Sequence, residues 1–386
     1  MNHSHGSAVR PAHVAAFLLF FLLGATTATL GATLPALREL YGLGTAGGSG
    51  LVTAYNVGAL TAIVGFGFAE RFVRARIAIS VLWLLFVAGC AAAAFAPQWP
   101  VFVACLVVAG FGYGGLVLYL NTAFATGFGR RNVLMVNLLN AVFGAGAITG
   151  PLVAGAVTDV RVVLLGIAVL AVPCLLARTC GNPVQPTGEG APSGPREWKA
   201  VLPFALIGFL YSGLETAIGT WESTHLVWTG WSVALAAQLT ALFWLGMTLG
   251  RSVIPLLTTK VAPIRIVLVG LVVASAALFA ATVPAVAPAG YAVAGVAMAP
   301  VLPTMLAWMA TIVPSAQSAN AVVLTACMAA NAVHPVVIAA AATRDKPVLI
   351  PLVLTGFALA CLVAAFAATR PRRAVTATPE PAATTA

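Results

Sequence analysis

The chain has 386 residues, of which 61% are hydrophobic and only 7% are charged. Soluble globular domains carry about 25% charged residues, so this composition excludes a soluble enzyme and indicates a polytopic membrane protein. The net charge of +10 comes from basic residues in short loops between apolar runs, which does not indicate a nucleic-acid-binding surface.

Twelve apolar runs follow one another along the chain, each about long enough to cross a bilayer as a helix. Six lie in the first half, at 12–36, 48–70, 77–96, 100–126, 132–158 and 161–178. Six lie in the second half, at 200–226, 231–257, 264–283, 286–312, 317–342 and 347–369. The first run is too long for the apolar part of a cleaved signal peptide, so we expect an uncleaved helix. The sequence therefore predicts an all-α membrane protein with twelve transmembrane helices.

A polar segment divides the twelve runs into two sets of six. Residues 179–199 are rich in Pro and Gly and lack periodicity, which predicts a flexible cytoplasmic linker. Residues 370–386, rich in Pro, Ala and Thr, predict a disordered cytoplasmic tail.

The two halves share short sequence matches at similar spacing. Asn56-Val-Gly58 matches Trp244-Leu-Gly246, and Ala109-Gly110 matches Ala294-Gly295, at offsets of 188 and 185 residues. Such parallel repeats are an architecture of transporters. We expect two pseudo-symmetric six-helix bundles, at 1–178 and 200–369.

The basic residues predict the orientation. With both termini inside, 15 of the 19 Lys and Arg residues face the cytoplasm, and Arg38, Arg161, Arg344 and Lys346 face outward. Cytoplasmic loops of membrane proteins are enriched in Lys and Arg. This distribution predicts a multi-pass plasma-membrane protein with both termini in the cytoplasm.

One membrane span carries acidic residues. Helical spacing places Tyr211, Glu215, Ile218, Glu222 and His225 on one stripe of the seventh run. A carboxylate at membrane depth is costly and normally faces the protein interior or a wet cavity. Glu215 and Glu222 are therefore candidates for proton coupling, and a structural hydrogen bond between helices is the alternative. Glu222 and His225 lie nearer the helix end, so a position at the level of the lipid headgroups is an equal alternative to a functional role for them.

Other chemical motifs are missing from the sequence. The six cysteines have no C-x-x-C spacing, which predicts buried free thiols. No HExxH, GxSxG or ATP-binding motif occurs, so we expect neither an enzyme, such as one acting on lipid, nor a metal or other cofactor. The short loops also argue against a receptor or scaffold.

The loop after the second run resembles a gating loop. It reads Gly65-Phe-Gly-Phe-Ala-Glu70-Arg71-Phe-Val-Arg74-Ala-Arg76 and is similar to the G-x-x-x-D-R-x-G-R loop of the major facilitator superfamily. Charged residues at helix ends can lock neighbouring helices together. The corresponding place in the second half is Arg251, with no acid beside it in the sequence. The resemblance implies a cytoplasmic gate formed by Glu70, Arg71, Arg74 and Arg251, with topology signalling as the alternative.

The fifth run carries the most specific resemblance. Asn137 to Gly155 is similar to the N-x-x-x-x-F-G-x-G-x-x-x-G-P pattern of the fucose-permease-like branch of that superfamily, and to the G-P-x-x-G element of proton-linked drug exporters. The fourth and seventh runs also resemble that branch. The resemblance implies a twelve-helix fold and sugar uptake. The two acids that sugar permeases of this branch carry fall at Gly31 and Val117 here, which departs from the pattern.

The candidate solute-binding residues are polar or aromatic side chains within apolar runs. They are Asn56, Tyr113, Asn121, Asn137, Asn140, Tyr211, Glu215, Gln238, Trp244, Trp308, Asn331 and His334. Amides and aromatic rings suit a neutral polyol or a mixed polar–aromatic compound. For each Asn the alternative is a hydrogen bond between helices. His334 precedes Pro335, so a structural role for His334 is an alternative to a role in transport.

The sequence thus predicts a secondary transporter of a small organic solute that works by alternating access, coupled to protons, within a lipid bilayer and as a monomer. Two versions stay open, uptake of a sugar-like solute and proton-antiport export of a drug or natural product.

Overall fold

The structure is a computed structural model that describes residues 11–44, 47–48, 50–69, 73–157, 159–180, 195–258, 260–313 and 316–369. Within these ranges the first half forms α1 (Pro11–Ala32), α2 (Leu34–Leu40), α3 (Leu51–Ala69), α4 (Ala75–Ala94), α5 (Trp99–Thr126), the 3₁₀ turn η1 (Gly129–Arg131), α6 (Asn132–Val157), α7 (Val160–Ala171) and η2 (Val172–Thr179). The second half forms α8 (Pro195–Trp228), α9 (Val233–Leu257), α10 (Pro263–Ala280), α11 (Ala287–Met298), α12 (Val301–Ala310), α13 (Ala316–Ala341) and α14 (Leu349–Ala368).

These helices account for the predicted membrane spans. Eleven helical stretches are long and apolar enough to cross a membrane, and a shorter apolar stretch, Leu51–Gly65 in α3, supplies the twelfth. The predicted all-α architecture with twelve spans is confirmed.

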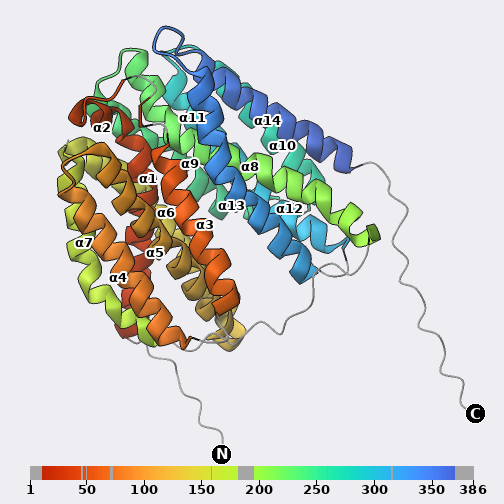
Figure 1. Ribbon diagram of the computed structural model, residues 1–386. Helices are drawn as coiled ribbons and strands as arrows, with labels where there is room; N and C mark the ends of the chain where they lie inside the picture. Colours follow the sequence, from red (N-terminus) through yellow and green to blue (C-terminus); the bar gives the residue numbers. More distant parts are fainter. Residues whose placement is uncertain are drawn as a thin grey trace, which may run out of the picture.

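Two hydrophobic cores divide the molecule. One core is built from α1 to η2, which we call the N bundle, and the other from α8 to α14, which we call the C bundle. Figure 1 shows the N bundle in red to yellow-green and the C bundle in green to blue, side by side.

The two ends of the molecule differ. We call the end at which α1, α4, α6, α8 and α10 begin the basic end, because Arg74, Arg76, Arg130, Arg131 and Lys199 lie there. The bundles meet at the opposite end and diverge towards the basic end, as Figure 1 shows. Close contacts between the bundles support this view: a side chain at Gly31 would overlap the carbonyl of Gly219, and Thr53 Oγ1 donates to the carbonyl of Ala332 at 2.9 Å.

Prolines interrupt three of the predicted spans. The first span ends at Ala32, and a separate helix, α2, follows with Pro35 in its first turn. The tenth span breaks between α11 and α12 at Pro300, and the sixth tightens into η2 at Pro173. Proline lacks a backbone N–H and clashes with the preceding turn, which favours a break at these positions. The runs were predicted as single spans, and their internal breaks were not.

Glycines of α6 allow it to pack on both bundles. A side chain at Gly146 or Gly150 would overlap backbone atoms of α1, at Phe21 and Ala25. On another face of α6, a Cβ at Gly155 would lie 2.5 Å from the carbonyl oxygen of Ala234 in α9. These glycines therefore let α6 approach its neighbouring helices closely.

Candidate functional site

The central feature of the site is an ion pair between two helices of the C bundle. Nη2 of Arg251, in α9, lies 3.2 Å from Oε1 and 3.3 Å from Oε2 of Glu215, in α8. The side chain of Glu215 keeps 17% of its surface accessible and that of Arg251 keeps 44%. Tyr211 is buried one turn before Glu215, and its hydroxyl interacts electrostatically with both charges. The pair is therefore held by the C bundle but is not sealed inside it.

The N bundle presents aromatic and amide groups near this pair. Tyr113 in α5 is half-buried, and its hydroxyl is close enough to Glu215 for an electrostatic interaction. The Tyr113 ring packs on Tyr55 in α3, with 5.2 Å between the ring centroids. About two turns further towards the basic end, Asn140 in α6 donates to Oδ1 of Asn121 in α5 at 3.2 Å.

The space between these groups opens towards the basic end. Gly144 in α6 lies against Thr248 in α9, where a Cβ at Gly144 would be 2.6 Å from Oγ1 of Thr248. Asn140 and Arg251 lie about one turn closer to the basic end on the same two helices. Both side chains are exposed, so the helices separate beyond the Gly144–Thr248 contact. The ion pair thus lies close to exposed side chains on the basic-end side of the Gly144–Thr248 contact.

A buried arginine holds the opposite end closed. Arg38 in α2 donates through Nε to the carbonyl of Gly47 at 2.8 Å and through Nη1 to Oγ1 of Thr224 in α8 at 3.0 Å. Its guanidinium lies over the rings of Trp221 and Trp228, 5.4 and 5.7 Å from their centroids. Burial lowers the pKa of Arg38 to about 10, so the group stays charged at neutral pH. We call these five residues the Arg38 contact, and it joins the two bundles.

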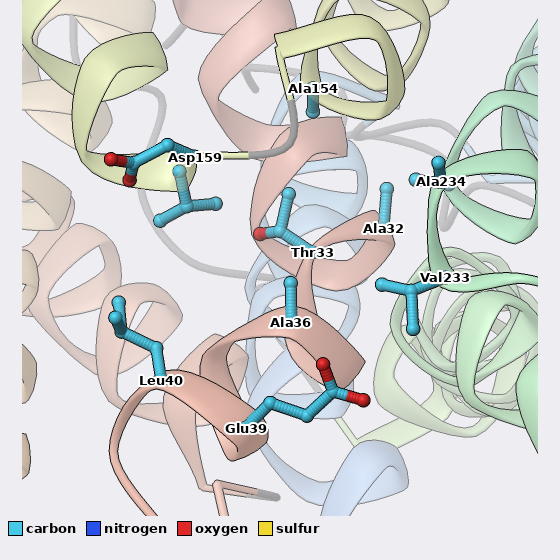
Figure 2. A pocket seen from close by; sticks show the side chains of 11 residues that line it. Ala32, Thr33, Ala36, Glu39, Leu40, Ala154, Asp159, Val233 and Ala234 are labelled. Atoms are coloured by element: carbon cyan, nitrogen blue, oxygen red, sulfur yellow. The ribbon is translucent and has the colours of Figure 1, made fainter.

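A pocket of about 540 Å³ lies beside this closed contact, between the bundles at the opposite end. It is lined by Ala32, Thr33, Ala36, Glu39, Leu40, Ala154, Asp159, Val160, Val233, Ala234 and Ala237. Figure 2 shows the carboxylates of Glu39 and Asp159 pointing in opposite directions. Asp159 also caps α7 by accepting from the backbone N–H of Arg161 at 2.9 Å. The two acids therefore do not converge on one point in the pocket.

The predicted stripe on α8 divides into two environments. Glu215 reaches the accessible space, whereas Glu222 and His225 are fully buried. His225 Nδ1 lies 3.0 Å from the hydroxyl of Tyr291 in α11, and Glu222 interacts electrostatically with that hydroxyl. Both residues lie near the end of α8, which ends at Trp228, and Tyr291 of α11 covers His225. In this conformation they belong to the interior of the C bundle.

Two predicted binding residues lie within the C bundle. The Asn331 side chain in α13 is 2.8 Å from the Ser212 hydroxyl in α8. His334 is 2% exposed, with Nδ1 3.2 Å from the carbonyl oxygen of Ala330. The His334 ring packs between Phe209 and Phe357 at centroid distances of 5.1 and 4.4 Å. These contacts join α8, α13 and α14, and neither side chain meets the ion pair.

The other predicted binding residues are spread over the interface and the bundle ends. Asn56 donates to Val52 within its own helix, and Gln238 packs against Gly155 near the opposite end. Trp244 lies against Gly219. Asn137 lines a small pocket of about 220 Å³ beside Asn132, and Trp308 packs on Phe204 at a centroid distance of 4.8 Å.

The predicted gate is described only in part. Glu70 and Arg71 lie outside the described residues, and Arg74 is exposed at the start of α4. Arg251 has no acid beside it in the sequence, and its acidic partner, Glu215, comes from the neighbouring helix α8. Arg251 therefore belongs to the central site.

Sequence reasoning missed the Arg38 contact. Arg38 counted only as one of the few basic residues on the outer side, and 186 residues separate it from Thr224. The sequence features that could have indicated this contact are an arginine that follows the first apolar span and two tryptophans near the end of the seventh. Among the described residues, no group of three or more His, Cys, Asp or Glu is placed to hold a metal ion.

Comparison with known proteins identifies the family. The family model described as Major Facilitator Superfamily matches residues 16–335. A comparison with curated protein sequences finds no significant match.

Solved structures share the fold. The nucleoside transporter NupG superposes with a TM-score of 0.73 at 15% identity, covering 94% of this chain and 99% of that chain. A bacterial homologue of the human lysosomal transporter Spinster, in an inward-facing and occupied conformation, superposes with a TM-score of 0.72 at 17% identity, covering 95% and 98%. At these identities the likeness supports the fold alone. The family match spans most of the chain, and it establishes that this chain belongs to the major facilitator superfamily and is a membrane transporter rather than an enzyme.

Proposed function

We propose that this protein is a secondary transporter that moves a small, hydroxyl-rich organic solute across the plasma membrane by alternating access, coupled to protons. The basic end faces the cytoplasm, because cytoplasmic loops of membrane proteins are enriched in Lys and Arg, and both termini lie there. The protein acts as a monomer, since each chain holds both bundles and the space between them.

The observation that carries the proposal is the Glu215–Arg251 pair, whose side chains both stay partly accessible between the helices. Charged residues at membrane depth are rare and mark solute or ion pathways. The pair lies between two bundles that touch at the opposite end and separate at the basic end, which is the geometry of an inward-open transporter. Rocking of one bundle against the other would expose the same pair to the outside.

The side chains around the pair favour a neutral solute with hydroxyl groups and an apolar or aromatic face. Glu215 accepts hydrogen bonds and Arg251 donates them, so a polyol can bridge the two. Tyr113 offers a ring face, and the Asn121–Asn140 amides lie along the route from the basic end. Sugars and nucleosides share these features, and nucleosides are the substrate class named for NupG.

Protonation and the ion pair compete for the same carboxylate. The pair uses one guanidinium nitrogen, Nη2 of Arg251, and a proton on Glu215 removes the negative charge that this nitrogen faces. Loading of a proton would therefore release Arg251 to bind the solute or to let the bundles move. This competition couples proton movement to solute movement without any further group.

The experiment uses the purified protein in proteoliposomes with an imposed pH gradient. One pH unit is worth about 1.4 kcal/mol per proton and can drive about tenfold accumulation of solute. We expect Glu215→Gln to abolish gradient-driven accumulation while exchange of labelled for unlabelled solute continues, because exchange needs no net proton movement.

Glu39→Gln is the matched control, since Glu39 is an exposed acid at the opposite end and should not affect accumulation. Glu222→Gln tests the second proton-coupling candidate in the same assay. Full concentrative transport by Glu215→Gln would discard the proposed role of Glu215.

Export of a drug or natural product by proton antiport is the second candidate. Gly31, where sugar permeases of the branch carry an acid, has no room for a side chain because it packs on Gly219. The gradient assay separates the two versions, because an acidic outside drives uptake by symport and an acidic inside drives loading of inverted vesicles by antiport.

A further inference from the structure

The outer surface of the C bundle has an apolar groove that transport does not use. It has a volume of about 450 Å³ and lies between α9, α10 and the α11–α12 break. Its lining is Ile254, Thr258, Val261, Arg265, Ile266, Val269, Gly270, Val273, Val293, Val296, Ala297 and Pro300. The helix α10 packs on α11, α12 and α14 of its own bundle, so the groove lies away from the N bundle.

Local chemistry explains why the groove exists. The chain breaks at Pro300, so α12 does not continue the line of α11. Gly270 lets α10 approach α11 closely at the same depth, since a Cβ there would lie 2.6 Å from the carbonyl oxygen of Ala297. Val269 and Val273, 61% and 40% exposed, line one wall.

The groove has the length of part of an acyl chain. From Arg265 to Val273 along α10 is about 12 Å, and half of the hydrocarbon core of a bilayer is about 15 Å. The groove therefore covers most of one leaflet, starting from the basic end.

Positive charge gathers at the end of the groove where a lipid headgroup would lie. Arg265 lines the groove, and Lys260 is exposed in the turn before α10. No described carboxylate is within ion-pairing distance of either side chain. The first turn of α10 has no acidic residue, and its N-cap, Ala262, makes no side-chain hydrogen bond. A helix N-terminus attracts anions, so backbone and side chains favour the same ligand.

We infer that this groove binds one anionic phospholipid of the leaflet at the basic end, with an acyl chain between α10 and α11 and the phosphate on Arg265 and Lys260. An apolar slot with two basic groups at one end matches a negatively charged headgroup and a hydrocarbon tail. The uncharged remainder of the lining offers nothing to a polar solute.

The test is native mass spectrometry of the full chain, released from nanodiscs with equal amounts of phosphatidylglycerol and phosphatidylcholine. We expect the wild type to retain one phosphatidylglycerol. Each basic residue near a membrane surface contributes about 1 kcal/mol to the attraction of anionic lipid, so Lys260→Ala with Arg265→Ala should weaken retention on the order of 30-fold.

Two further variants test the tail and the charge separately. Val269→Trp fills the groove without removing charge and should also lower retention. Arg74→Ala with Arg76→Ala removes two exposed basic residues at the same end of the N bundle and should leave retention unchanged. Lys260→Arg should retain the lipid, which shows that loss in the alanine variant is not misfolding.

Equal retention of phosphatidylcholine, equal loss in the Arg74–Arg76 variant, or full retention by Val269→Trp would overturn the inference. None of these results depends on transport, so the lipid site and the proposed function stand or fall separately.

Discussion

Glu215 and Arg251 show how a membrane protein can keep charged groups at depth. A lone carboxylate in a low-dielectric interior would be strongly destabilising, and an ion pair offsets much of that cost. Here the ion pair offsets the cost of burying the charges only in part, because one nitrogen of Arg251 contacts both carboxylate oxygens and the side chains stay partly accessible. A pair of this kind can be opened by a proton or a solute more readily than a sealed one.

Sequence reasoning found half of this pair. Glu215 could be singled out because an acid within an apolar run has few purposes. Its partner could not, since 36 residues separate them and Arg251 reads as one of many basic residues near a helix end. Which side chains meet across helices depends on helix rotation, and the hydropathy of an all-round apolar helix does not fix that rotation.

Gly31 tests the closed contact at the level of one residue. Gly31→Leu would place a side chain against the Gly219 carbonyl, and overpacking of this kind costs about 1–3 kcal/mol. We expect the equilibrium to shift about 5- to 150-fold towards states open at the opposite end, with slower net transport. Two measurements report the effect. One is the initial rate of transport, and the other is the reactivity of an introduced thiol, Ala32→Cys, with and without Gly31→Leu.

Gly166→Leu is the control, because nothing lies within 4 Å of a Cβ at that position. Equal transport rates in the two variants would contradict the packing described for Gly31.

Asn331 separates a structural role from a binding role. Its amide contacts the Ser212 hydroxyl across two helices, and such bonds in membranes contribute about 0.6 kcal/mol each. We expect Asn331→Leu to lower the free energy of unfolding by about 0.6 kcal/mol with little change in KM. Thermal unfolding in detergent and solute titration measure the two quantities.

Asn56→Leu is the matched variant, since the Asn56 amide donates within its own helix and should cost less stability. A large rise in KM for Asn331→Leu without loss of stability would restore the original prediction of solute contact.

At the scale of elements, α2 and α8 are joined by one buried cation. Arg38 has hydrogen bonds to Gly47 and Thr224 and lies over two tryptophan rings, which together offset the burial of its charge. Removing the side chain removes the contacts with Thr224, Trp221 and Trp228 of the C bundle, which exist only while the bundles meet at this end.

We expect Arg38→Ala to populate outward-open states. Leu40 in α2 and Leu235 in α9 are both exposed and can carry spin labels. Double electron–electron resonance between the two labels measures the separation of the bundles. The distance distribution should shift to longer values in the variant.

Arg161→Ala is the control for this experiment, because Arg161 lies over Tyr41 and donates to Ala96 inside the N bundle. A shift of the same size in both variants would mean that the loss of any arginine at this end loosens the fold.

Helix positions followed from the sequence because hydropathy and length determine them directly. The breaks at Thr33 and Pro300 did not follow, since a proline within an apolar run can kink, end or merely bend a helix. Packing on α8 and α10 decides among these outcomes, and that packing is a property of the assembled bundle.

For the whole molecule, the orientation can be tested by labelling. We expect a membrane-impermeant thiol reagent to modify Arg74→Cys and Asn140→Cys only in inside-out vesicles, and Leu40→Cys only in right-side-out vesicles. Arg74 and Asn140 are exposed at or towards the basic end and Leu40 at the other. The native cysteines are buried or half-buried, so the background should be low. Reversed labelling would invert the proposed topology.

The seam at which the bundles meet also determines what a pH titration of transport reports. Among the described residues its contacts include glycine backbones, hydroxyl-to-carbonyl bonds and Arg38, whose pKa of about 10 keeps it charged throughout the range from mild acid to mild alkali. Closure of the seam by these contacts should thus be indifferent to acidity across that range. A sigmoidal dependence of turnover on acidity would then originate with other groups, such as the acids within the bundles or Glu39 and Asp159 in the neighbouring pocket.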